Sequence, residues 1–159
     1  MSFEDWIFAL HLLGAATLVG SLVMSWIVVV PLRSADTPAA TLGLSRVAMV
    51  GAAATAFGLV AAIAFGIWLT ILRDDFQLWD GWVIAALALW ALATVALRRA
   101  FVESAKPAAK ARALVTAGEA DPSAELAALN RTPTGLTLRV VASLAIVLIV
   151  VDMIWKPGA

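Results

Sequence analysis

The sequence predicts an all-α membrane protein whose four transmembrane helices form an up-down-up-down bundle. Of the 159 residues, 63% are hydrophobic and only 14% are charged, whereas soluble domains are about half apolar and a quarter charged. A hydrocarbon core of about 30 Å is crossed by about 20 helical residues. Four apolar runs reach that length, at residues 6–30, 47–72, 81–101 and 137–155. We therefore expect residues 1–159 to form a single membrane domain.

The first span, residues 6–30, is expected to be retained and not cleaved as a signal. It is longer than a secretory apolar region of about 7–15 residues, and Glu4 and Asp5 stand where a signal peptide is basic. His11, the only histidine in the chain, lies in this span. If Trp6 marks the outer boundary, His11 lies about 7 Å inside it.

Small residues recur at every fourth position of the second span, within the stretch GAAATAFGLVAAIAFG. These residues are Ala54, Gly58, Ala62 and Gly66. Residues four apart share one face of a helix, and small side chains let two helix backbones approach closely in lipid. We expect this face to contact Ala16 and Gly20, a similar small pair in the first span. A contact between two copies of the chain is the alternative.

The third span, residues 81–101, carries Trp90 near the middle of the membrane. A buried indole N–H needs an acceptor, and Thr17 in the first span lies at a comparable depth. Five other tryptophans fall near the outer ends of their spans, as in an aromatic belt. They are Trp6, Trp68, Trp79, Trp82 and Trp155.

Residues 102–136 are predicted to be a short helical connector between the third and fourth spans. KPAAKARALVTAG is typical of a short helix, with Pro107 in its first turn and Gly118 after its end. DPSAELAALNRT indicates a second one, with Asp121 as its N-cap. The hydrophilic stretch 103–136 either lies on the inner leaflet, held by its basic residues, or docks a partner in a membrane complex.

The distribution of charge predicts which side of the membrane each loop faces. The segments 31–46 and 98–139 hold nine of the eleven basic residues, and the other side holds only Arg73 and Lys156. Basic loops stay in the cytoplasm, so both termini are expected outside. The formal net charge is zero, which gives no reason to expect a nucleic acid as partner.

The fourth span, residues 137–155, carries a second ionisable group, Asp152. Ionisable groups inside a span are costly and usually face the protein interior. Asp152 and His11 lie at similar predicted depths, and the first and last helices of an up-down bundle are neighbours, so the two side chains are predicted to meet. Alternatively, Asp152 pairs with Lys156 one turn later, and His11 bonds a backbone carbonyl.

The residues favour a role without catalysis. The chain has no cysteine, and it shows no nucleophile elbow, phosphate-binding loop or zinc-protease motif. We expect a scaffold or accessory subunit in the lipid bilayer with no cofactor, acting as a homodimer or with a partner that contacts 103–136. One alternative is a haem or copper protein with His11 and Met153 as ligands. Met24 cannot share that site, because it lies about 20 Å from His11 along the helix. The second alternative is a small proton-coupled transporter that uses His11 and Asp152.

Four short motifs resemble a known group of proteins. They are LHLLG in the first span, GIWLTI at the end of the second, GWVIAALALWAL in the third and WKPG at the C-terminus. The chain resembles a group of bacterial four-helix integral membrane proteins whose function is unknown, and it is distantly similar to the copper-resistance D membrane domain. The resemblance implies a place in the bacterial cell (inner) membrane. It points to His11 as the position of interest and supplies no catalytic residues.

Overall fold

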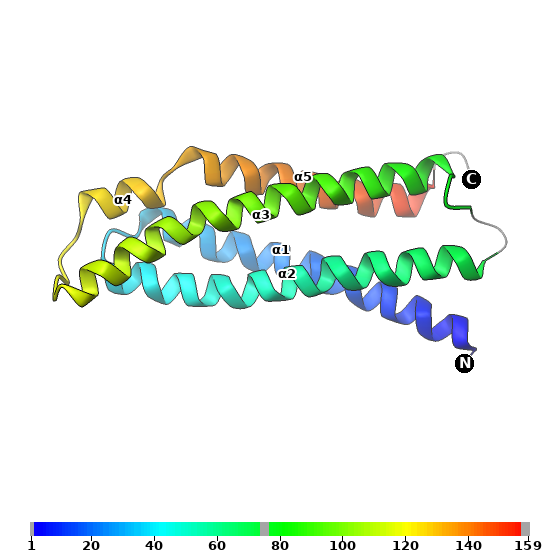
Figure 1. Ribbon diagram of the computed structural model, residues 1–159, viewed down its shortest axis with the longest axis horizontal. Coiled ribbons are helices and arrows are strands. Elements are labelled where there is room, and N and C mark those ends of the chain that lie inside the picture. Colours follow the sequence, from blue (N-terminus) through cyan, green and yellow to red (C-terminus); the bar gives the residue numbers. More distant parts are fainter. Residues whose placement is uncertain (1, 74–76, 157–159) are drawn as a thin grey trace.

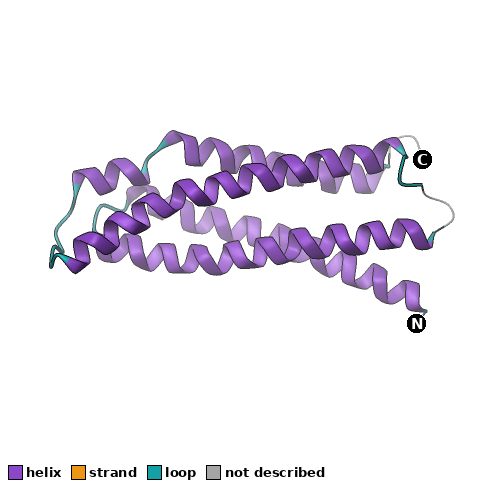
Figure 2. Cartoon of the chain, viewed as in Figure 1, coloured by secondary structure: helices purple, strands orange, loops and turns teal. Residues whose placement is uncertain are grey.

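The computed structural model describes residues 2–73 and 77–156, and in this part of the chain all regular structure is helical (Figure 2). The last two residues of the WKPG motif lie outside the described residues. The helices are α1 (Phe3–Ser34), α2 (Pro38–Leu72), α3 (Gly81–Thr116), α4 (Ala124–Asn130) and α5 (Pro133–Trp155). Four segments are long and apolar enough to cross a membrane: α1, α2, α3 and Ala124–Trp155, which contains α4 and α5. The predicted fold class is confirmed.

Local sequence sets where the first two helices begin. The Ser2 hydroxyl accepts a hydrogen bond from the Asp5 amide at 3.2 Å, and the Ser2 amide donates to the Asp5 carboxylate at 2.6 Å. This reciprocal pair satisfies amides that have no partner within the helix. At the start of α2, Thr37 accepts from the Ala40 amide and Pro38 occupies the first turn, where a missing N–H costs nothing.

The four long helices form two pairs. α1 packs along α2, and α3 packs along α5 (Figure 1). A small buried core joins the pairs near the middle of the bundle, and every long helix contributes to it. Its residues are Leu18, Leu59, Ala93, Ala145 and Ile146. Many large apolar side chains point outward, as expected for a surface in contact with lipid.

All four long helices extend beyond their apolar runs, and α2 and α3 do so furthest. α2 begins at Pro38 instead of residue 47, and α3 continues through Pro107 to Thr116 instead of ending near residue 101. The separate short helix predicted around Pro107 is therefore wrong. Hydropathy detects only the part of a helix that lies in lipid, and the alanine-rich continuation of α3 has high helix propensity.

The connector after α3 folds back onto the bundle. Asn130 donates from its amide nitrogen to the Ala35 carbonyl at 2.9 Å and to the Thr41 hydroxyl at 3.0 Å. The Ser123 amide donates to the Asp36 carbonyl at 2.9 Å. Ser123, not Asp121, is the N-cap of α4. These bonds attach α4 to the loop between α1 and α2.

The tryptophans predicted to form an outer belt divide into two groups. Four of them are exposed, as a belt requires: Trp6, Trp68, Trp79 and Trp155. Trp82 is buried in the bundle, with 5% of its surface exposed, and the ammonium of Lys156 lies 5.5 Å from its ring centre. Trp82 therefore contributes to packing between α3 and the end of α5.

Candidate functional site

His11 lies half-buried between α1 and α2. Its Nδ1 is 2.9 Å from the Ala62 carbonyl oxygen. Because a carbonyl only accepts hydrogen bonds, Nδ1 is the nitrogen that carries the proton in this contact. Gly66 lies beside the ring, and a Cβ there would be 3.1 Å from the imidazole Cε1. The alternative in which His11 bonds a backbone carbonyl is the arrangement found.

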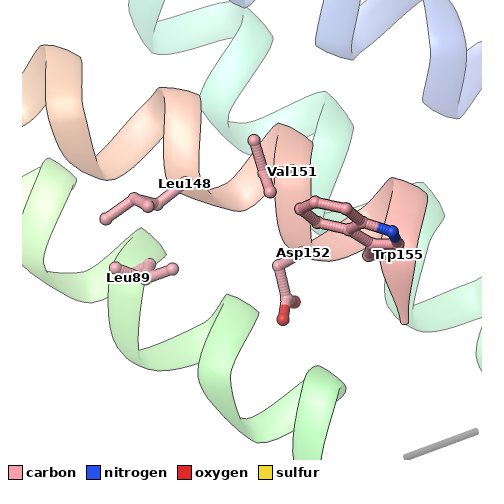
Figure 3. A pocket seen from close by; sticks show the side chains of 5 residues that line it. All are labelled: Leu89, Leu148, Val151, Asp152 and Trp155. Carbon is pink, nitrogen blue, oxygen red and sulfur yellow. The ribbon is translucent and has the colours of Figure 1, made fainter. Parts of the chain in front are cut away.

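Asp152 lies on α5 and faces α3, beside a shallow pocket of about 390 Å³. Figure 3 shows its carboxylate between these two helices, with Leu89, Leu148 and Trp155 around it. One carboxylate oxygen is buried and has no hydrogen-bond partner among the described residues. The lining is otherwise apolar, so the pocket offers no second group that would complete a polar site.

The structure does not bring His11 and Asp152 together. His11 bonds to α2, whereas Asp152 lies against α3, and no hydrogen bond or ion pair joins the two side chains within the described part of the chain. Toward the end of the bundle that holds α4, the Trp26 indole of α1 bonds the Ser143 hydroxyl of α5. The N-terminal end of α1 diverges from α5 in Figure 1. The expected pair is not formed because each side chain faces the other helix of its own pair, α2 for His11 and α3 for Asp152.

The two ligands predicted for haem or copper, His11 and Met153, come from helices of different pairs. Met153 is half-buried next to Asp152 on α5, the helix that packs along α3. Met24 lies further along α1, near Gly51 of α2. In the residues that the structure describes, no three His, Cys, Asp or Glu side chains gather where they could hold a metal ion. Binding of haem or copper remains a prediction.

The small-residue face of α2 lies against α1. A Cβ on Gly58 would be 2.8 Å from the Leu18 nitrogen, and a Cβ on Gly14 would be 2.7 Å from the Ala62 nitrogen. The contribution of α1 differs from the expectation. Ala16 is exposed, and Gly20 has no neighbouring atom within 4 Å of a Cβ placed on it. Gly14 and Leu18 therefore form the α1 side of this contact.

A larger cavity, of about 950 Å³, lies between the two helix pairs. All four long helices line it, from Leu22, Leu59 and Thr94 in the middle of the bundle to Arg112 near the end of α3. Its walls are mostly apolar, and alanines of α2 and α3 leave the space open. Such alanines occur at Ala48, Ala52, Ala56, Ala105 and Ala108.

A chain of hydrogen bonds forms one wall of this cavity. The Trp26 indole donates to the Ser143 hydroxyl at 3.0 Å, which donates to the Arg139 carbonyl at 2.7 Å. The Arg139 guanidinium donates to the Ser25 hydroxyl at 2.8 Å. Sequence reasoning assigned Arg139 to a basic loop and missed this site. An arginine two residues inside the fourth apolar run is the signal that could have indicated it.

The comparison with protein families decides the classification. A family model described as "Predicted integral membrane protein (DUF2269)" matches residues 6–157. The chain belongs to this family. No curated protein and no solved structure matches it. The resemblance to integral membrane proteins of unknown function is thus confirmed for nearly the whole chain.

Membership of DUF2269 establishes an integral membrane protein of unknown function. The family description names no ligand, partner or reaction. Similarity to the copper-resistance D domain has no support from these matches and stays a prediction. In this DUF2269 chain, the cavity between the helix pairs is the largest chemically distinctive feature described above.

Proposed function

We propose that this protein acts without catalysis and holds an amphiphile of the surrounding bilayer in the cavity between its helix pairs. The observation that carries the proposal is a cavity of about 950 Å³ whose walls come from all four long helices. Small-molecule sites are concave, mostly apolar and about 300–1,000 Å³ in volume. A complete transmembrane helix, about 10 Å wide and 30 Å long, would need more than twice this space.

We further propose that the cavity opens in the cytoplasmic half of a bacterial inner membrane, with both termini outside. Nine of the eleven basic residues lie in segments 31–46 and 98–139, which comprise the loops at one end of the bundle and the helix ends next to them. Basic loops are retained in the cytoplasm. The arginine-lined end of the cavity is then at the level of the inner leaflet.

The absence of cysteine makes this orientation directly testable. Single cysteines at Gln77 and Glu119, both exposed near opposite ends of the bundle, are treated in intact cells with a membrane-impermeant maleimide. We expect labelling at Gln77→Cys, and labelling at Glu119→Cys only after permeabilisation. The reverse pattern would refute the proposed orientation.

Occupation of the cavity can be tested with phosphatidylcholine that carries a photoactivatable diazirine in one acyl chain. The probe has no net charge, so it reports space for the hydrocarbon and not headgroup preference. We expect crosslinks to peptides of α2 and α3 in the purified protein in mild detergent. Ala56→Trp places a large ring in the cavity and should reduce crosslinking several-fold.

Ala64→Trp is the matched control, because Ala64 is also an exposed α2 alanine but does not line the cavity. It should crosslink like the unmodified protein. Equal labelling of the two variants would mean that the probe reports only the lipid-facing surface, and the proposed function would be abandoned. A second polypeptide bound tightly in the cavity in place of lipid would also overturn the proposed function. That result would instead support an accessory subunit that binds a partner helix.

A further inference from the structure

Among the described residues, the charged side chains that line the cavity are all cationic. Four arginines line it, and no aspartate or glutamate does. They are Arg46, Arg98, Arg112 and Arg139. Carboxylate and phosphate groups are the natural partners of guanidinium, which binds them through paired N–H donors. A cavity that is apolar at one end and cationic at the other complements a molecule with a hydrocarbon chain and an anionic head.

Arg139 is the most informative of the four. It is half-buried on α5, and its guanidinium donates to the neutral Ser25 hydroxyl at 2.8 Å. The ion pairs found within the described residues involve Arg73, Lys106 and Lys110, not Arg139. A guanidinium has five N–H donors, and a charge inside a span is costly unless it is paired. An anion in the cavity would supply the missing partner.

The wall around Arg139 holds the guanidinium in place before any ligand binds. Ser25 fixes one of its nitrogens from α1, and the bond from Trp26 to Ser143 joins the same two helices one turn away. Side chains held by such contacts lose less conformational freedom when a ligand arrives. The arrangement therefore favours binding of an anion at this level of the bundle.

Arg98 reaches a similar depth from the other side of the cavity. Trp90 bonds to the Leu59 carbonyl on α2, which places the two residues at one level. Arg98 follows Trp90 by eight residues, or about 12 Å along α3. Its guanidinium has no ion-pair partner in the described part of the chain, and it lines the cavity.

The depth of Arg139 follows from the contact between α1 and α2. The Leu18 backbone lies against Gly58, which neighbours Leu59. Ser25, the partner of Arg139, follows Leu18 by seven residues, or about 10 Å. Arg98 and Arg139 therefore lie at nearly the same depth, one on α3 and one on α5, where both can contact a single headgroup.

We propose that the cavity binds an anionic phospholipid of the inner leaflet, with its phosphate between Arg98 and Arg139 and one acyl chain extending toward Leu22 and Leu59. This inference rests on the proposed function and adds the charge and class of the ligand. Arg46 also lines the cavity, about 20 Å from Leu59 along α2. Arg46 can therefore contact a second polar group of a phospholipid head. A free fatty acid has only its one carboxylate, so a phospholipid fits the cavity better.

The test compares phosphatidylglycerol with phosphatidylcholine of identical acyl chains, added to the purified, delipidated protein and measured by native mass spectrometry. We expect at least a tenfold preference for phosphatidylglycerol. Arg139→Gln removes the charge but keeps an amide that can donate to Ser25, and it should reduce the preference about tenfold. Arg99 follows Arg98 on α3 but is exposed and does not line the cavity. Arg99→Gln therefore removes the same charge outside the cavity and should leave the preference unchanged.

Thermal unfolding of the same samples provides a second measurement. Phosphatidylglycerol should raise the Tm of the unmodified protein and of Arg99→Gln, but not that of Arg139→Gln. If Arg139→Gln does not fold, Arg98→Gln replaces it, with the same expected loss of preference. Equal effects of Arg139→Gln and Arg99→Gln would mean a diffuse surface charge effect and would overturn the inference.

Two other results separate this inference from the proposed function. Equal binding of both phospholipids, still blocked by Ala56→Trp, would overturn the assignment of an anionic ligand and leave the cavity function standing. Palmitate that displaces phosphatidylglycerol completely at equal concentration would show that a single carboxylate suffices, and would overturn the choice of a phospholipid. Insensitivity of all binding to Ala56→Trp would overturn both proposals.

Discussion

Gly58 determines how closely α1 and α2 approach each other. A Cβ added there would lie 2.8 Å from the Leu18 nitrogen and 2.9 Å from its Cα, and backbone atoms cannot move aside as a flexible side chain can. In lipid, such close approach supplies the dispersion contact that holds helices together. The small-residue pattern of α2 therefore has a physical role at this position.

We predict opposite effects of the same substitution at two glycines. Gly58→Ala should lower the free energy of unfolding by about 1–3 kcal/mol because it overpacks the helix contact. Gly20→Ala, where no atom lies within 4 Å of the added Cβ, should raise it by up to about 1 kcal/mol through helix propensity. Thermal unfolding in detergent measures both, and equal shifts would contradict the close contact.

Asp152 and Arg139 are charged residues inside α5 that lack a partner of opposite charge within the described residues. They lie on opposite halves of the helix and face different surroundings. Asp152 borders a small apolar pocket, whereas Arg139 borders the large cavity together with three other arginines. Sequence reasoning selected Asp152 and His11 because both are ionisable groups inside apolar runs at similar predicted depths. It missed Arg139 because a positive charge near a span boundary is ordinary.

At the scale of elements, the apolar runs predicted that the four spans exist, but not where the helices end. The second and third runs lie inside longer helices, because hydropathy reports the lipid-facing part alone. The position of α4 against the bundle could not be predicted from the sequence either. It depends on Asn130 bonding to Ala35 and Thr41, residues nearly ninety or more positions earlier, which no local pattern indicates.

We predict that Asn130→Ala detaches the end of α4 from the loop between α1 and α2. The substitution removes two hydrogen bonds and leaves the buried Ala35 carbonyl and Thr41 hydroxyl without this donor. The cost should be about 1–3 kcal/mol. Limited proteolysis should then cleave residues 117–132 several-fold faster.

Ser104→Ala is a suitable control for this prediction. The Ser104 hydroxyl bonds only within α3, to the Phe101 carbonyl, so its loss should leave cleavage of residues 117–132 unchanged. Cleavage of Asn130→Ala at the unmodified rate would mean that the buried Leu126 side chain alone holds α4 in place.

At the scale of the whole molecule, the sequence predicted an antiparallel four-helix bundle but not its division into two pairs. The long helices are apolar on all sides, so hydropathy marks no face as the one that contacts protein, and only the small-residue face of α2 indicates a helix contact. Lipid and a neighbouring helix offer almost the same environment to a leucine or valine. The expected meeting of His11 and Asp152 failed for this reason, and Arg139 inside the fourth apolar run is the local sequence signal for the cavity between the pairs.

Few specific contacts join the two pairs in the middle of the membrane, and the bond from the Trp90 indole to the Leu59 carbonyl, at 3.1 Å, is one of them. The sequence predicted that this N–H would find an acceptor in the bundle, although the suggested Thr17 bonds instead to Leu13 within α1. Trp90 also packs against the buried core. Its loss should therefore loosen the α1–α2 pair from the α3–α5 pair.

We predict that Trp90→Phe lowers the Tm, whereas Trp79→Phe does not, because Trp79 is 72% exposed near the end of the bundle. The lost hydrogen bond and indole volume should together cost about 1–3 kcal/mol. Loosening of the pairs should also change crosslinking of the diazirine phospholipid, because Leu59 lines the cavity. A lower Tm with unchanged crosslinking would mean that Trp90 supports the helices without shaping the cavity. An unchanged Tm would mean that the helix pairs are held together by the bonds around Arg139 and Asn130.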